Sequence, residues 1–142
     1  MTENEQKIGI ISCTGVSSDS RCSKEGLIAR QAMYKVIEDF RPDKTLLVCL
    51  PALAGEVEED VIFVRDYPTI VIEGCPDDCS TKVLGRFDTK QIFSTYYVRD
   101  FIKDIELSDS LINLSPEEDA IAERIAERVA LDVDKILQSK NK

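Results

Sequence analysis

Four cysteines stand where a parallel sheet would bring them together. Cys13, Cys49 and Cys75 each follow a short run of β-branched or Leu-rich residues, and Cys79 comes four residues after Cys75. Such runs are typical of buried strands. Because the segments between them have helical patterns, the strands should be parallel, with their carboxyl ends at one edge of the sheet. Ligands of open α/β sheets bind at that edge, so four thiols there predict a metal or redox centre.

The most specific motif is G-C-P-D-D-C at residues 74–79. Pro76 favours the first position of a helix, which makes Cys75 the expected N-cap. Cys79 would then lie one turn beyond Cys75, with both sulfurs on the same face. A helix N-terminus also lowers the pKa of a thiol and so favours the thiolate, the form that binds metal. The alternative is that both are ordinary small buried residues, because free cysteine is among the most buried residue types.

Cys22 and two carboxylates complete the set of candidate site residues. Cys22 lies at the far end of a long polar loop, residues 14–22, and could replace one of the four ligands, act as a resolving thiol or have no role. The chain contains no histidine, so a catalytic site would need Glu73 or Asp78 as its acid–base group or as a hydrogen-bond partner of a ligand. The alternative role for Glu73 is to accept backbone hydrogen bonds from a neighbouring loop or turn.

Composition narrows the class of protein. The 142 residues are 43% hydrophobic and 32% charged, which predicts one soluble domain over residues 1–142. The net charge of −9 argues against nucleic acid or an anionic membrane as a partner. No apolar run approaches the roughly 18 residues of a membrane helix. Residues 1–7 have no signal-peptide pattern, which predicts a cytoplasmic location with reduced thiols. There, five cysteines favour metal or thiol chemistry over a disulfide scaffold.

Hydrophobic periodicity predicts an α/β fold. The expected strands cover residues 7–13, 44–50, 69–74 and 90–97, and the expected helices cover residues 23–40, 56–66, 76–84 and 116–138. Residues 51–55 are expected to form a connector, and Gly85 to end a helix in the left-handed region. Ser115 and Glu118 form a capping box for the last helix. This order predicts a three-layer Rossmann-like or flavodoxin-like domain with a four-stranded, mainly parallel sheet in the order 2-1-3-4.

Three segments resemble one known family. They are I-S-C-T-G at residues 11–15, R-P-D-K-T-L-L-V-C-L-P-A-L-A-G at residues 41–55 and I-E-G-C-P-D-D-C-S-T-K at residues 72–82. They resemble the DGC-domain proteins, archaeal and bacterial proteins described as zinc-binding. The resemblance covers about residues 7–105, and Glu73-Gly74-Cys75 stands at the family's Asp-Gly-Cys. It implies a metal site formed by the recurring cysteines, which are Cys13, Cys49, Cys75 and Cys79, but it implies no reaction.

Three functions follow as hypotheses. The first is a metal-binding protein that holds zinc in a mostly thiolate site. Four thiolates would form a closed structural or storage site, and three with an open position would suit catalysis or metal transfer. The second is a thiol redox or iron–sulfur protein that uses the same cysteines, because cysteine ligation alone does not separate these metals. The third is a partner-binding domain whose cysteines are only structural. The sequence identifies neither a reaction nor a protein partner.

Overall fold

A computed structural model of the chain describes residues 7–74 and 76–140. In this part of the chain, four strands form one sheet in the order β2-β1-β3-β4. Each pair of neighbouring strands is parallel. The strands are β1 (Ile8–Ser12), β2 (Thr45–Leu47), β3 (Pro68–Glu73) and β4 (Gln91–Tyr97). The α/β class, the parallel sheet and the strand order expected from the sequence are confirmed.

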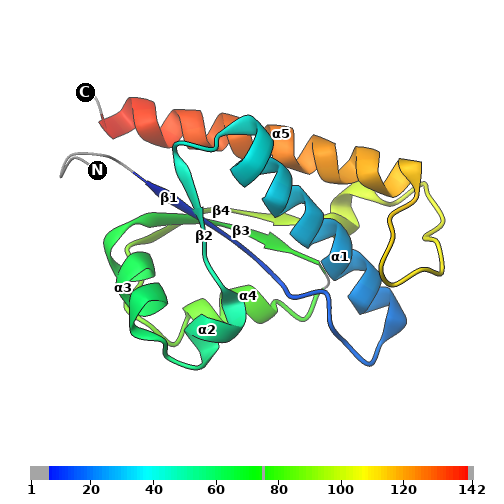
Figure 1. Cartoon of the computed structure of the whole chain (residues 1–142), viewed down its shortest axis with the longest axis horizontal. Helices are drawn as coiled ribbons and strands as arrows, with labels where there is room; N and C mark the ends of the chain where they lie inside the picture. Colours follow the sequence, from blue (N-terminus) through cyan, green and yellow to red (C-terminus); the bar gives the residue numbers. More distant parts are fainter. Residues whose placement is uncertain (1–6, 75, 141–142) are drawn as a thin grey trace.

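Helices cover both faces of the sheet (Figure 1). One layer contains α1 (Ser20–Lys35), which continues as a π-helical segment (Val36–Phe40), and α5 (Pro116–Lys140). The other layer contains α2 (Leu50–Ala54), α3 (Glu58–Asp66) and α4 (Cys79–Leu84). A short 3-10 segment (Val98–Phe101) follows β4. Within residues 7–74 and 76–140, no helix combines the length and apolarity that a membrane span requires.

Strands β1 and β3 are buried along their whole length because helices cover both faces of the sheet there. Ile8 and Ile10 of β1 pack in the core beneath α1 and α5, whereas Ile11 packs in the core against α2, α3 and α4. Side chains alternate between the faces of a strand, so a strand buried on both faces lacks the apolar–polar alternation of a half-exposed one. The apolar face of α5 is buried; its members are Ile121, Ile125, Val129, Val133 and Ile136.

Local hydrogen bonds explain where several elements begin and end. The capping box of α5 is confirmed, because Glu118 N donates to Ser115 Oγ at 3.2 Å and Ser115 N donates to Glu118 Oε1 at 2.8 Å. The expected connector at residues 51–55 is wrong, since Leu50–Ala54 forms α2 with Pro51 in its first turn. The pyrrolidine ring fixes a helical φ where no intrahelical N–H bond is needed.

Gly85 also differs from the expectation. Its φ of −64° is right-handed, so the predicted left-handed end of the helix is wrong. The chain continues with right-handed turns after α4: Gly85 N donates to Thr81 O at 3.0 Å, and Arg86 N donates to Val83 O at 3.0 Å. The backbone does not change to a left-handed conformation at this position, so the conformation does not require glycine.

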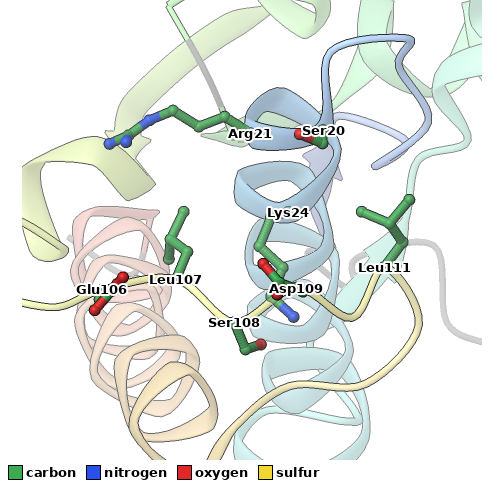
Figure 2. A pocket seen from close by; sticks show the side chains of 8 residues that line it. All are labelled: Ser20, Arg21, Lys24, Glu106, Leu107, Ser108, Asp109 and Leu111. Carbon is green, nitrogen blue, oxygen red and sulfur yellow. The ribbon is translucent and has the colours of Figure 1, made fainter.

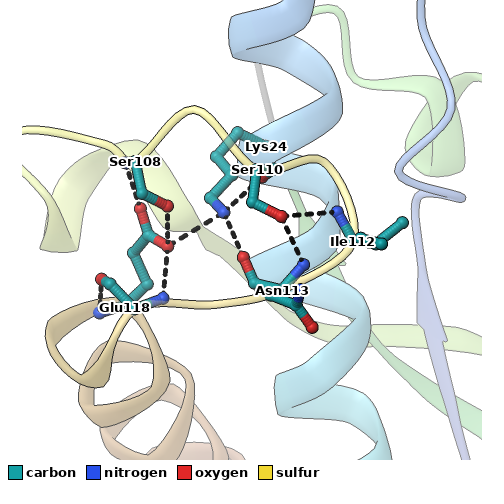
Figure 3. A network of polar contacts seen from close by, with 7 residues as sticks. Lys24, Ser108, Ser110, Ile112, Asn113 and Glu118 are labelled. Atoms are coloured by element: carbon teal, nitrogen blue, oxygen red, sulfur yellow. Dashed lines mark hydrogen bonds and ion pairs between the residues drawn. The ribbon is translucent and has the colours of Figure 1, made fainter.

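A buried ion pair holds the irregular segment between the 3-10 segment and α5. The side chains of Lys24 and Glu118 are 2% and 0% exposed, and Lys24 Nζ lies 3.0 Å from Glu118 Oε1. Lys24 Nζ also donates to the carbonyl oxygens of Ser110 and Asn113, both at 2.6 Å (Figure 3). Glu118 accepts a further bond from Ser108 N at 2.7 Å. This network fastens residues 108–113 to α1 and α5.

Glu118 should make the fold sensitive to acid. Burial alone would raise the pKa of this carboxyl, but hydrogen bonds from Ser115, Ser108 and Lys24 outweigh burial and lower the pKa from 4.5 to about 2. A lowered pKa stabilises the folded state above the unfolded-state pKa, and this contribution is lost as the pH falls through the folded-state pKa. We expect this group to remove about 3 kcal/mol from the free energy of unfolding between about pH 5 and pH 2.

Urea unfolding over that pH range tests this prediction, with Glu118→Gln as the comparison. The variant should be less stable than the wild type at neutral pH, because it loses the charge that Lys24 neutralises. It should also lose less stability on acidification, because its amide does not titrate. Equal losses in the two proteins would mean that other carboxyls govern acid unfolding.

Candidate functional site

The candidate site lies where β1 and β3 end. From this edge the chain leaves β1 toward α1 on one face of the sheet and leaves β3 toward α4 on the other face (Figure 1). In open α/β sheets such a divergence between neighbouring strands opens the crevice that binds ligands. A pocket of about 100 Å³ occupies this place, and its lining comes from the β1–α1 loop, α1, α2, Asp77 and the start of α4.

Three cysteines from separate parts of the chain line this pocket. They are Cys13 after β1, Cys22 in the first turn of α1 and Cys79 at the start of α4. Cys49 lies at the N-cap of α2 and lines a neighbouring pocket, which Cys13 also lines. Cys13 is therefore common to both pockets. The fourth predicted ligand, Cys75, lies outside the described residues.

Cys22 enters the site because α1 begins earlier than expected. The helix was expected to start at Ser23, but Asp19 caps it and accepts hydrogen bonds from Arg21 N at 2.9 Å and Cys22 N at 3.4 Å. Ser23 instead ties down the β1–α1 loop, since its hydroxyl donates to Ser17 O at 2.8 Å. The thiol of Cys22 faces Asp77 Oδ2 at 4.0 Å. An aspartate two residues before Arg21 was the available signal, because aspartate is a preferred N-cap.

The sequence predicted that the G-C-P-D-D-C segment is helical from Pro76, and this prediction is wrong. Helix α4 begins at Cys79, and its N-cap is Asp78. The cap interaction comes from Glu73 at the end of β3, whose carboxylate accepts from Ser80 N at 3.3 Å and Thr81 N at 2.9 Å. A buried carboxylate thus satisfies the free N–H groups of the first turn. The expected Cys75 N-cap is therefore wrong, because the helix that it would cap starts later.

Glu73 has the structural role that the sequence left as the alternative. Its side chain is 1% exposed and also accepts from Thr81 Oγ1 at 2.8 Å. These bonds fix the start of α4 against the end of β3. They also orient the segment that carries Cys79.

Asp78, directly before Cys79, is held in an uncommon conformation. Its φ of 55° and ψ of 42° are left-handed, which aspartate tolerates better than most residues. Its Oδ1 atom is buried and has no hydrogen-bond partner within residues 7–74 and 76–140. The pKa of Tyr97 is raised, first by a hydrogen bond to Asp78 and then by burial and the charges of Asp78, Glu73 and Asp100. Strained residues of this kind cluster at functional sites.

Glycines bring the three segments of the site into contact. A Cβ on Gly74 would lie 2.6 Å from the Cα of Gly26 and 2.7 Å from the sulfur of Cys13. A Cβ on Gly26 would lie 2.6 Å from the Cα of Gly15. The backbones of the β1–α1 loop, α1 and the end of β3 therefore touch, and the Cys13 sulfur lies at their junction. Only residues without a side chain allow this approach.

The chemistry of these donors suits a thiophilic metal. Sulfur atoms and the carboxylate of Asp77 line the same small pocket, and thiolates are preferred ligands of zinc and of iron–sulfur clusters. Within the part of the chain that the structure describes, no three Cys, Asp or Glu side chains lie close enough together to hold a metal ion. The described residues thus supply donors of the right kind but do not by themselves complete a site.

A different pocket, of about 290 Å³, lies between α1 and residues 106–111 (Figure 2). Its two cations already have carboxylate partners. Lys24 pairs with Glu118, and Arg21 Nε lies 3.5 Å from Glu25 Oε1. We therefore assign this pocket to the packing of the irregular segment against α1.

These features define a class of protein: a three-layer α/β domain with a parallel sheet and cysteines from separate segments at the edge where β1 and β3 diverge. A family model described as the DGC domain matches residues 9–103. The match spans well over half of the chain, so the chain belongs to the DGC-domain family, as the sequence resemblance predicted. No curated protein and no solved structure matches the chain.

Proposed function

We propose that this chain binds zinc through thiolates at the carboxyl edge of its sheet. The observation that carries the proposal is that Cys13, Cys22 and Cys79, from three separate segments, line one small pocket. Zinc favours tetrahedral sulfur sites, and the absence of histidine leaves sulfur as the main available donor. A cytoplasmic location, where thiols stay reduced, belongs to the same proposal.

The proposed ligands are Cys13, Cys75 and Cys79, with a fourth thiolate from either Cys49 or Cys22. The family resemblance favours Cys49, whereas the shared pocket favours Cys22. When bound, zinc supplies a rigid link between segments or, with an open coordination position, a Lewis acid. The chain itself holds Cys79 in place through the Glu73 cap on α4 and leaves that residue exposed. The net charge of −9 leaves nucleic acid and anionic membranes out of the proposed partners.

Metal analysis of anaerobically purified protein, combined with its absorption spectrum, tests the proposal. One zinc per chain in a colourless sample supports it. A broad absorption band near the boundary of the visible and ultraviolet ranges would instead indicate an iron–sulfur cluster. A metal-free protein whose count of free thiols changes reversibly with oxidant and reductant would indicate thiol redox chemistry.

Serine substitutions should identify the ligands. We expect Cys75→Ser and Cys79→Ser each to lose tightly bound zinc, because a hydroxyl is a far poorer ligand than a thiolate. Of Cys22→Ser and Cys49→Ser, one should lose the metal and the other should keep it, which identifies the fourth ligand. Zinc content and thermal unfolding are measured side by side for all four variants. Full zinc occupancy in Cys75→Ser would rule out the proposed site.

A further inference from the structure

The pocket beside the cysteine pocket has the character of a small-molecule site. It has a volume of about 250 Å³ and lies between the β1–α1 loop, α1, the end of β2 and the start of α2. Its wall is mainly apolar and includes Val16, Met33, Leu47, Val48, Leu50 and Pro51. Tyr34 and Leu47 are 39% and 43% exposed, so the pocket is open to solvent. Concave apolar sites with a few polar groups are typical of ligand-binding pockets.

One cation lines this pocket and lacks a carboxylate partner. Arg30 Nη1 donates to Thr14 O at 3.2 Å, and this is its one hydrogen bond to the described residues. None of the described carboxylates lies within 4.0 Å of its guanidinium, although acidic residues outnumber basic ones 27 to 18 in the chain. A guanidinium has five N–H donors in a planar fork, so most of these donors stay available to a ligand.

We propose that this pocket binds a small organic monocarboxylate with an apolar body. A guanidinium fork matches a carboxylate through two parallel hydrogen bonds. The apolar wall would contact the rest of the ligand, and Tyr34 in the lining suits an aromatic or branched aliphatic group. A single cation balances a single negative charge. A phosphate dianion would leave charge uncompensated beside an apolar wall.

The position of the pocket connects this ligand to the cysteine site. Cys13 lines both pockets, and Cys49 lines the apolar one. A bound carboxylate would therefore lie next to the candidate metal centre. Binding as proposed uses only Arg30 and the apolar wall, so it does not depend on zinc, and the two proposals can fail independently.

Nuclear magnetic resonance titration of the full ¹⁵N-labelled chain tests the proposal with two matched probes. Phenylacetate has about ten heavy atoms and should bind with a dissociation constant on the order of 1 mM, the range open to so small a ligand. Its binding should shift the backbone amide signals of Thr14, Leu47 and Cys49. Phenylacetamide has the same shape without the charge, and we expect it to bind about tenfold more weakly.

The variant Arg30→Gln should reduce phenylacetate affinity to that of phenylacetamide and leave phenylacetamide unchanged. Glutamine removes the charge, and the amide spectrum shows whether the fold is kept. Arg65→Gln is the matched control, because Arg65 lies on α3 and pairs with its neighbour Asp66 at 3.1 Å. This variant should bind both probes as the wild type does.

Several outcomes would overturn the proposal. They include equal affinity of the wild type for the two probes, shifts that centre on residues outside this pocket, and the absence of saturable shifts. A carboxylate that coordinates a bound metal would keep its affinity in Arg30→Gln and lose it when a chelator removes the metal. That pattern would support the proposed metal site and reject this pocket.

Discussion

Replacing Gly74 with alanine is expected to destabilise the protein by more than about 3 kcal/mol, or to prevent folding. The added methyl group would lie 2.6 Å from both the Cα and the N of Gly26 and 2.7 Å from the sulfur of Cys13. Two of these three atoms belong to backbone packed within the core, so they cannot move aside as the end of a flexible side chain would. The loss of stability comes from steric overlap of the new methyl group with these atoms. The overlap could be removed only if α1 separated from the end of β3.

Gly85→Ala and Gly26→Ala make this prediction specific. Gly85 has a right-handed φ of −64°, and the nearest atoms to an added Cβ lie at 3.5 Å, so alanine there should change stability by less than about 1 kcal/mol.

Gly26 lies inside α1, where helix propensity alone favours alanine by about 1 kcal/mol. Its Cβ would overlap with Gly15, however, and we expect destabilisation instead. Urea unfolding measures all three variants, and a stable Gly26→Ala would disprove the close-packed junction.

Replacing Lys24 with methionine is expected to cost about 3 to 5 kcal/mol, the usual penalty for removing one partner of a buried ion pair. The Glu118 carboxylate would remain buried without its cation. The carbonyl oxygens of Ser110 and Asn113 would also lose their donor. Methionine fills a similar volume, so the loss reports the charge and its hydrogen bonds rather than a cavity.

Lys35→Met is the matched control for Lys24→Met. Lys35 also links α1 to α5, through an ion pair of 3.3 Å with Asp119, but the Asp119 side chain is 51% exposed. Exposed pairs contribute at most about 1 kcal/mol, so this variant should be nearly neutral. Hydrogen exchange adds a second readout: Lys24→Met should release the amides of residues 108–113, and Lys35→Met should not. Similar losses in the two variants would show that the buried network contributes little.

Much of the fold follows from patterns within single segments. The apolar runs that form β1 and β3 are buried on both faces, and such runs, separated by helical segments, are diagnostic of a parallel sheet. The parallel sheet could therefore be predicted from the sequence, and the rule of right-handed crossovers then favoured the observed order β2-β1-β3-β4. The same holds for α5, because Ser115 and Glu118 are three residues apart and cap the helix reciprocally.

Two of the wrong predictions concern the residues that cap helices. Pro76 after Cys75 is a sound local signal for a helix start, but Glu73 reaches the amides of Ser80 and Thr81 and starts α4 at Cys79. Asp19 likewise starts α1 at Ser20 instead of the expected Ser23. Where two residues could cap the same helix end, their capping preferences do not decide between them. The difference in free energy between two good caps is small compared with the contribution of tertiary packing.

Local sequence determined which types of residue form the candidate site. It also determined at which edge of the sheet they gather, because each cysteine follows or adjoins a recognisable element. Which cysteines share a pocket was set by three-dimensional packing. Cys22 joins Cys13 and Cys79 because three glycines let the β1–α1 loop, α1 and β3 come into backbone contact. Such contacts join residues far apart in the chain, and their distances depend on how whole layers pack. Periodicity along a single segment carries no information about them.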